Sequence, residues 1–488
     1  MKDNIRYNVI ANIIRTVAMT LLSFISFPFV CNKLGDASLG TYTWANTFVY
    51  YFLILAKLGV PNVAIRECAK VKDDKEALSK KAQEFFIIQG VLTLLSFGLM
   101  CLIIFTAKGD LFENKELIFI LSINFLVGVF SFEWIYIALE KHFYISFRSI
   151  VILAFSSILI ILFVRHKEDT YLYAFLSILG TILTIISNLI FLPRFITFKK
   201  IGKYNFKQYF KSLIFVFGIS FVLTLYNQSD TFILGIIDPS KSEVGSYSVG
   251  IKAIDIVITI ITSLSAVFIP RATMLYQKQK YTLFDNLTKY AFNICLFIAI
   301  PAIVTLILLS KEITLLISGN STEGYAHAPM ALIILASMIL TYSISDMIYS
   351  QVLLPMQKER IYFYVMMVGS VLNISASIGL GFLFKDSPIV GIAIATMACD
   401  LIILFSLLIL TKKYTFKSLF NVNSLKLLIA GALLTVSTIL IKTILASYSS
   451  ILVIFTSIFI GAIVYLLTLL LLKENLVSSF KKSKPATN

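Results

Sequence analysis

Charged side chains fall inside long apolar stretches of this chain, where they could only do chemistry in a wet site. An ionisable residue inside a membrane-spanning helix costs about 2.5–3.5 kcal/mol on insertion scales, so it usually faces water, a partner or a substrate. Arg15, Lys57 and Lys252 are three cations of this kind, and Asp255 is the one clear counter-charge beside them, with Asp230 nearby. The pattern favours a polar, cationic cavity that binds a ligand.

The polar residues around these cations recur three or four positions apart, which places them on one face of a helix. They lie mainly in the apolar runs that start near residues 8, 41, 209 and 244, which are expected to share the cavity. The candidate cavity residues are Asn12, Arg15, Asn46, Tyr50, Lys57, Gln228, Lys252, Asp255, Thr259 and Asp346. A simpler interpretation is open for each cation: Arg15 and Lys57 extend to lipid headgroups, and Lys252 pairs with Asp255 three residues on.

A second polar group lies mainly in the C-terminal half and suits a small hard cation. Carboxylate, amide and hydroxyl oxygens are the ligands that such cations prefer. Na⁺ is one candidate coupling ion, and a carboxylate that carries a proton is the competing interpretation. Hydrogen bonds that merely join helices are the third. No other cofactor or metal is expected. The residues are Asp230, Asn373, Ser377, Thr396 and Asp400.

Membrane-spanning helices must position these residues. The 488 residues are 58% hydrophobic and 14% charged, whereas soluble chains have about 45–50% apolar and about 25% charged residues. A hydrocarbon core about 30 Å thick needs roughly 20 apolar residues per helix. Fourteen such runs start near residues 8, 41, 83, 115, 144, 171, 209, 244, 289, 328, 361, 389, 424 and 450. The sequence therefore predicts an all-α polytopic membrane protein with about fourteen transmembrane helices.

The net charge of +16 is distributed unevenly along the chain. Most Lys and Arg residues fall in alternate loops between the runs, which is the bias that marks cytoplasmic loops. Both termini are therefore predicted to be cytoplasmic, and the basic loops to contact lipid headgroups. No soluble basic module is present, so a nucleic-acid partner is not expected.

An internal repeat divides the chain. "LGTYTWANT", residues 39–47, reappears as "VGSYSVGIK", residues 244–252, and Gly40 aligns with Gly245. Parallel repeats are common in transporters that bind substrate between two lobes. We expect two six-helix lobes, a basic amphipathic linker that forms a helix on the inner leaflet, and two further helices with a basic cytoplasmic tail. The predicted segments are 1–193, 194–211, 212–413 and 414–488.

Motifs for other functions are missing from the sequence. It contains no G-x-x-x-x-G-K-[ST], H-E-x-x-H or G-x-S-x-G segment, so neither ATP hydrolysis nor hydrolase chemistry is indicated. The five cysteines are scattered without a C-x-x-C pair, which indicates neither a disulfide framework nor a zinc site. The chain is expected not to be an enzyme.

Four segments resemble a known family, the polysaccharide flippases of the MATE-like multidrug/oligosaccharidyl-lipid/polysaccharide superfamily. The resemblance covers nearly the whole chain. Each of the motifs is short, and the segment from the Trp to the Glu-Lys pair within "EWIYIALEKHFYISFR" is typical of flippases for O-antigen and capsule repeat units. The motifs are "LGDASLGTYTWA" (34–45), "EWIYIALEKHFYISFR" (133–148), "VGSYSVGIKAID" (244–255) and "FIPRATMLY" (268–276).

The resemblance implies a V-shaped, two-lobed transporter of the bacterial cytoplasmic membrane. Such a protein moves undecaprenyl-diphosphate-linked oligosaccharide repeat units from the inner to the outer leaflet by alternating access, for O-antigen, capsule or exopolysaccharide synthesis. Its implied partners are this lipid-linked oligosaccharide, membrane lipids and other membrane proteins of polysaccharide assembly. A monomer is expected.

The resemblance also suggests roles for single residues. Related lipid II flippases have cationic cavity residues in places similar to those of Arg15, Lys57 and Lys252. Their sodium site matches Asp230, Asn373, Ser377 and Thr396 approximately. Ser377 stands where those relatives have an acid, and Asp400, one turn beyond Thr396, is a candidate substitute for it.

Three alternatives remain. A MATE-type drug/cation antiporter predicts an acid-rich cavity and twelve spans, whereas this cavity is cationic. A lipid II flippase would use the same mechanism on another substrate. A glycan polymerase is disfavoured because no long outer loop is present.

Overall fold

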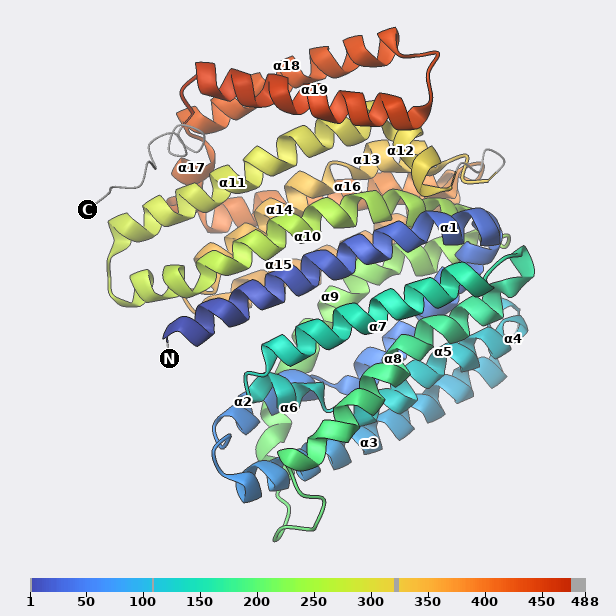
Figure 1. Ribbon diagram of the computed structural model, residues 1–488, viewed down its shortest axis with the longest axis vertical. Coiled ribbons are helices and arrows are strands. Elements are labelled where there is room, and N and C mark those ends of the chain that lie inside the picture. Colours follow the sequence, from blue (N-terminus) through green and yellow to red (C-terminus); the bar gives the residue numbers. More distant parts are fainter. Residues whose placement is uncertain (1, 108, 320–323, 475–488) are drawn as a thin grey trace. The chain divides into compact units, whose positions relative to one another are not determined.

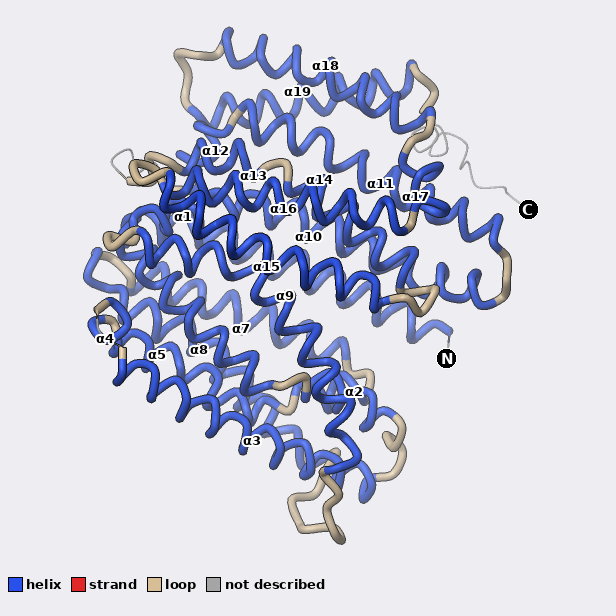
Figure 2. Tube along the Cα trace, turned by 180° about the vertical axis from the view of Figure 1, so that it is seen from behind, coloured by secondary structure: helices blue, strands red, loops and turns tan. Residues whose placement is uncertain are grey.

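The computed structural model describes residues 2–107, 109–319 and 324–474, with the backbone alone for residues 2–13. Every regular element in these ranges is a helix, as Figure 2 shows. Within these ranges, twelve helices are long and apolar enough to cross a membrane. The predicted all-α polytopic membrane fold is confirmed. The chain divides into two compact units, Met1–Gly245 and Ser246–Asn488, and each is described by itself.

In the first unit, the long helix α1 packs against α3, α5, α7 and α9, and α8 packs against both α5 and α7 (Figure 1). The elements are α1 (Lys2–Lys57), α2 (Val60–Ala69), α3 (Lys75–Thr106), α4 (Asp110–Glu113), α5 (Lys115–Gly128), η1 (Val129–Ser131), α6 (Glu133–Ala138), α7 (His142–Phe163), η2 (Lys167–Asp169), α8 (Thr170–Phe191), η3 (Leu192–Arg194), η4 (Lys207–Tyr209) and α9 (Phe210–Ile237). The next helix, α10 (Ser242–Gln277), begins at the end of this unit.

In the second unit, α15 packs on α16, and the pair α18 and α19 packs through α18 on α11. Its elements after α10 are α11 (Tyr281–Leu308), α12 (Ser310–Ile317), α13 (Ala328–Leu335), α14 (Met338–Met347), the π-helix η5 (Ile348–Leu353), α15 (Glu359–Leu383), α16 (Pro388–Leu410), α17 (Lys412–Leu419), α18 (Val422–Ile444) and α19 (Ser450–Leu471). The boundaries of the four sequence segments predicted above stay a prediction.

Two places account for the difference between fourteen predicted spans and twelve long helices. The first two predicted runs share α1, whose 56 residues would extend about 84 Å as a straight helix, far beyond a core of about 30 Å. Gly35 breaks α1 with φ 76° and ψ 174°. The fourth run contains α5, which has 14 residues and is followed by η1 and α6. Fourteen spans and cytoplasmic termini stay predictions.

The two repeat glycines lie where backbones approach closely. A Cβ added at Gly40 would lie 1.8 Å from the carbonyl oxygen of Lys241, and one added at Gly245 would lie 2.2 Å from that of Asp36. The second part of α1 and the start of α10 therefore touch at both members of the aligned pair. Only glycine fits such contacts.

The basic segment 194–211 is not the helix that its composition suggested. Between η3 and η4 it is an irregular loop. Side chains of α3 hold its backbone: Ser79 accepts a hydrogen bond from the Thr197 amide (2.9 Å), and Gln83 donates to the Thr197 carbonyl (2.8 Å). The buried Glu84 accepts from the Asn205 amide (2.8 Å). These bonds replace the internal bonds of a helix, so the amphipathic-helix prediction is wrong for this segment.

Candidate functional site

A cavity of about 580 Å³ lies inside the first unit, between α1, α7 and α8 and the broken segment of α5, η1 and α6. Two of the predicted cations, Arg15 and Lys57, line it from the two parts of α1. The other lining residues are Met19, Ser23, Ser26, Leu53, Asn124, Gly128, Ser131, Glu133, Arg148, Ser149, Ile152, Leu153, Ser156, Ser157, Ile160, Tyr173, Ser177, Gly180, Thr181, Thr184 and Ile185. Three basic side chains thus face one acidic side chain across this lining.

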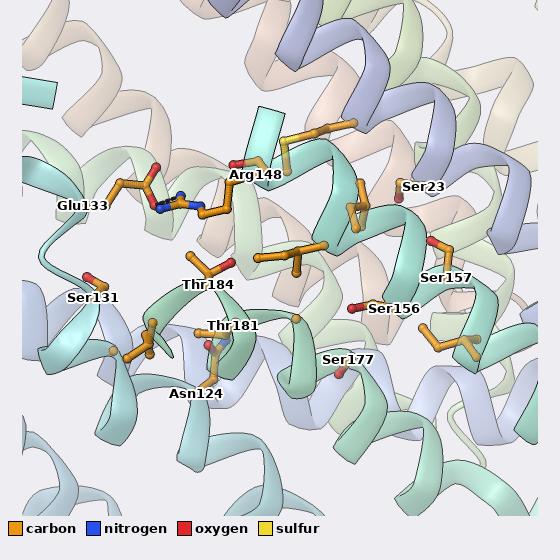
Figure 3. A pocket seen from close by; sticks show the side chains of 18 of the residues that line it. Ser23, Asn124, Ser131, Glu133, Arg148, Ser156, Ser157, Ser177, Thr181 and Thr184 are labelled. Atoms are coloured by element: carbon orange, nitrogen blue, oxygen red, sulfur yellow. Dashed lines mark hydrogen bonds and ion pairs between the residues drawn. The ribbon is translucent and has the colours of Figure 1, made fainter. Parts of the chain in front are cut away.

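Arg148 and Glu133 form the most closely connected charged group of the cavity. Figure 3 shows the Arg148 side chain extending toward Glu133, and the Nη2 and Oε2 atoms lie 3.2 Å apart. The other Arg148 amino nitrogen donates to the Asn188 side-chain oxygen. The Asn188 amide in turn donates to the Ser131 carbonyl, and the Tyr144 ring lies 5.5 Å from the guanidinium carbon. Arg148 is therefore held by α8 and by its own helix as well as by the ion pair.

A break in the chain positions Glu133. Helix α5 ends at Gly128, η1 follows, and Phe132 adopts a left-handed backbone with φ 44° before α6 begins at Glu133. A bulky residue rarely adopts positive φ, and such strain tends to occur at functional sites. Without this break Glu133 would continue the α5 helix instead of beginning α6 beside Arg148.

The rest of the wall is rich in hydroxyl groups (Figure 3). Ser177, Thr181 and Thr184 recur at helical spacing on α8, and Ser149, Ser156 and Ser157 come from α7. The Ser156 side chain is buried, and within the described residues its hydroxyl has no hydrogen-bond partner. Such a wall can donate to and accept from many hydroxyl groups of a ligand.

Comparison with known proteins decides the family. A family model described as "Polysaccharide biosynthesis protein" matches residues 5–276, more than half of the chain. The chain belongs to the polysaccharide biosynthesis protein family. A second model, MatE, matches residues 216–378. A protein of Escherichia coli (strain K12) named "Putative O-antigen transporter" is 23% identical over 416 residues, which cover 82% of this chain and 95% of that protein.

Solved structures show the same fold. The lipid II flippase MurJ in an inward closed conformation superimposes with a TM-score of 0.70 at 18% identity, over 95% of this chain and 99% of that one. An inward-facing multidrug resistance MATE family transporter of the MOP superfamily gives a TM-score of 0.59 at 15% identity, over 82% of this chain and 96% of that one. The predicted family resemblance is confirmed. These relatives are transporters or flippases by name and none is an enzyme, in agreement with the prediction.

Only some of the residues that the sequence predicted for the cavity line the cavity of the first unit. Arg15 and Lys57 line it, whereas Asn46, Tyr50 and Gln228 do not. Gln228 instead accepts a hydrogen bond from Thr47 (3.3 Å) and so joins α9 to α1. The Asn12 side chain lies outside the described residues.

The remaining predicted cavity residues belong to the second unit. Lys252, Asp255 and Thr259 follow one another along α10, where the exposed Asp255 interacts electrostatically with Lys252. Asp346 lies in the last turn of α14, two residues before the π-helix η5 begins. Isolated π-helical turns are frequent at functional sites. The cavity role of these four residues stays a prediction.

Two of the predicted ion-site residues of the second unit are joined directly, and a third is bonded to a neighbouring helix. Asn373 on α15 donates to Thr396 on α16 (3.2 Å), and Thr341 on α14 donates to Asp400 on α16 (3.2 Å). Asn373, Thr396 and Asp400 are buried, as is Ser377. The fifth candidate, Asp230, is buried in α9 of the first unit. Among the described residues no cluster of three or more His, Cys, Asp or Glu side chains could hold a metal ion.

Sequence reasoning missed Arg148 and Glu133 as site residues, although both were present in a quoted motif as its last and first residues. The hydroxyl-bearing residues that α7 and α8 contribute to the cavity are also absent from the predicted cavity set. The signal was available: Arg148 is an ionisable residue in an apolar helix. The α8 residues 177, 181 and 184 already repeat at helical spacing.

Proposed function

We propose that this member of the polysaccharide biosynthesis protein family is a lipid-linked oligosaccharide flippase. It moves undecaprenyl-diphosphate-linked repeat units from the inner to the outer leaflet of the bacterial cytoplasmic membrane, for O-antigen, capsule or exopolysaccharide synthesis. The observation that carries this proposal is the cavity of the first unit, in which Arg15, Lys57 and Arg148 lie beside a wall of hydroxyl groups.

The chemistry of the cavity suits both polar parts of such a substrate. A diphosphate and several sugars are costly to transfer into hydrocarbon without compensating hydrogen bonds. Guanidinium and ammonium groups bind phosphate oxygens by charge-assisted hydrogen bonds, and arginine does so with two parallel bonds. The hydroxyl wall formed by α7 and α8 binds sugar hydroxyls. The polyprenyl tail remains in the lipid.

Movement across the membrane by alternating access is part of the proposal. Its support is the fold, because relatives of the same fold have been solved in inward-facing and outward-facing conformations. Na⁺ or H⁺ is the proposed coupling ion, and the buried polar pairs around Asn373 and Asp400 are the proposed ion site. The protein acts as a monomer among membrane lipids and the other membrane proteins of polysaccharide assembly.

A drug/cation antiporter is the second candidate, because the MatE model matches residues 216–378. The three basic residues of the cavity argue against it, since they repel organic cations. A lipid II flippase differs from the proposal only in its substrate.

Deletion of the gene tests the proposed function. The expected result is that lipid-linked repeat units accumulate on the cytoplasmic face, and that the intact gene restores surface polysaccharide whereas the Arg148→Ala variant does not. Unchanged surface polysaccharide together with raised sensitivity to cationic drugs would show an antiporter instead. Restoration of surface polysaccharide by a MurJ-type lipid II flippase would indicate that this protein is itself a lipid II flippase.

A further inference from the structure

Glu133 makes the contacts in the cavity that a bound anion would make. Its two carboxylate oxygens bridge cations from two helices: Oε1 lies 3.5 Å from Arg15 Nη1 on α1, and Oε2 lies 3.2 Å from Arg148 Nη2 on α7. Lys57 makes no hydrogen bond or ion pair with any described residue, but Glu133 attracts it electrostatically. Two of the three basic residues of the cavity are therefore paired with one carboxylate, and the third is attracted to it.

Arg148 has further contacts in addition to its ion pair with Glu133. Its bond to Asn188, the hydrogen bond from Asn188 to the Ser131 carbonyl and its position over the Tyr144 ring also hold the guanidinium. Only 5% of the Arg148 side chain is exposed, against 31% of the Glu133 side chain. The acid is thus the more accessible partner, and a ligand that enters the cavity can replace it.

The position of Glu133 is costly to maintain, which argues that the contact has a function. Phe132, the preceding residue, is buried and adopts φ 44°, a conformation that a bulky residue adopts only when its surroundings force it. The strain and the chain break together direct one acid into an otherwise basic cavity.

We infer that Glu133 is an internal counter-anion, which occupies the diphosphate position of the empty cavity and is displaced when the substrate binds. This inference rests on the proposed function. A diphosphate held by three cations without a competitor would leave slowly, and transport requires a ligand to be released as well as bound. Glu133 therefore lowers the affinity of the cavity for the diphosphate and accelerates its release.

Glu140 provides a matched control. It lies seven residues further along the same motif and pairs with Lys72 (2.8 Å), but neither residue lines the cavity. Glu133→Gln and Glu140→Gln thus remove the same charge from the same motif, inside and outside the cavity.

The test uses the purified full chain in lipid nanodiscs and measures the Kd of farnesyl diphosphate, with farnesol as the uncharged probe. Glu133→Gln removes the carboxylate that competes with the diphosphate, so the Kd for the diphosphate should fall. Glu133 makes two partly exposed ion pairs, which are weak individually, so we expect the Kd to fall by about twofold to tenfold. Glu140→Gln should leave the Kd unchanged, and farnesol should not distinguish the variants. In a reconstituted transport assay, the Glu133→Gln variant should release its substrate more slowly than the wild type, because it binds the substrate more tightly.

The two proposals fail in distinguishable ways. If Arg148→Ala weakens diphosphate binding but Glu133→Gln leaves it equal or weaker, the counter-anion inference is wrong and the diphosphate site stands. If Arg148→Ala also leaves binding unchanged, the proposed function loses its site. Should Glu133→Gln fold poorly, Glu133→Asp keeps the charge but is too short to bridge both guanidinium groups. It is expected to lower the Kd less than twofold at unchanged Tm, and a raised Kd would overturn the inference.

Discussion

Replacement of Gly40 by alanine is expected to destabilise the first unit, because the glycine has no room for a methyl group. The added Cβ would lie 1.8 Å from the Lys241 carbonyl oxygen and 3.0 Å from the Gly245 amide nitrogen, whereas ordinary van der Waals contact begins at 3.4 Å. Both neighbours are backbone atoms, which cannot rotate away as a flexible side chain could. The two helices must separate locally for the variant to fold.

The size of the effect follows from the cost of overpacking. Extra methyl groups forced into a packed site typically cost about 1–3 kcal/mol, and 1 kcal/mol lowers Tm by about 2–4 °C in domains of 150–250 residues. Gly40→Ala should therefore lower Tm by about 2–12 °C. Gly245→Ala, whose Cβ would lie 2.2 Å from the Asp36 carbonyl oxygen, should act in the same direction.

The assay can use the intrinsic fluorescence of the protein. Both tryptophans, Trp44 and Trp134, are buried in the first unit, and Trp44 lies one helical turn from Gly40. The control is Gly98→Ala on α3, where an added Cβ meets nothing within 4 Å. Because alanine favours a helix over glycine by about 0.5–1 kcal/mol, the control should leave Tm equal or slightly raised. A Gly40→Ala variant that melts at or above the Gly98→Ala control would refute the reasoning.

Further predictions concern the linker, the ion site and the cavity. Glu84→Ala should lower the free energy of unfolding by about 1–3 kcal/mol, because it leaves the Asn205 amide and the Tyr209 hydroxyl without their acceptor. Tyr209→Phe should lower it by about 1 kcal/mol. Thermal unfolding measures both variants. Asp400→Asn should abolish the dependence of transport on Na⁺ or pH in proteoliposomes while diphosphate binding persists; unchanged ion dependence would exclude this ion site. Arg148→Lys keeps the charge but loses the two-pronged guanidinium, so its diphosphate Kd should fall between those of the wild type and Arg148→Ala; a value equal to that of the wild type would show that charge alone suffices.

Features that depend on residues close together in the sequence could be predicted from local sequence patterns. The apolar runs predicted an all-helical membrane protein. The pairing of Gly40 with Gly245 was visible as a repeat, and the structure shows why both are glycine. The sequence analysis placed Asn373 and Thr396 in the same candidate ion site, and the structure joins these two residues by a hydrogen bond between α15 and α16.

Contacts between distant parts of the chain could not be read in this way. The segment 194–211 has the alternation of a surface helix, but its backbone bonds to side chains of α3 that lie more than a hundred residues earlier. Glu133 and Arg148 are 15 residues apart, a spacing that has no meaning within one helix. The break at Phe132 starts α6 at Glu133, and the turn between α6 and α7 then brings Arg148 beside it. The periodicity of the sequence does not indicate that Phe132 adopts a left-handed backbone conformation.

The central claim is that the cationic cavity of the first unit binds the diphosphate of a lipid-linked oligosaccharide and carries it across the membrane. Its most direct measurement is transbilayer movement of a fluorescent polyprenyl-diphosphate disaccharide in proteoliposomes that contain wild-type protein, Arg148→Ala or the Gly98→Ala control. We predict movement with the wild type and the control, and movement at the protein-free rate with Arg148→Ala at matched reconstitution. Equal movement by all three proteins, or none by the folded wild type under any ion gradient, would contradict the claim.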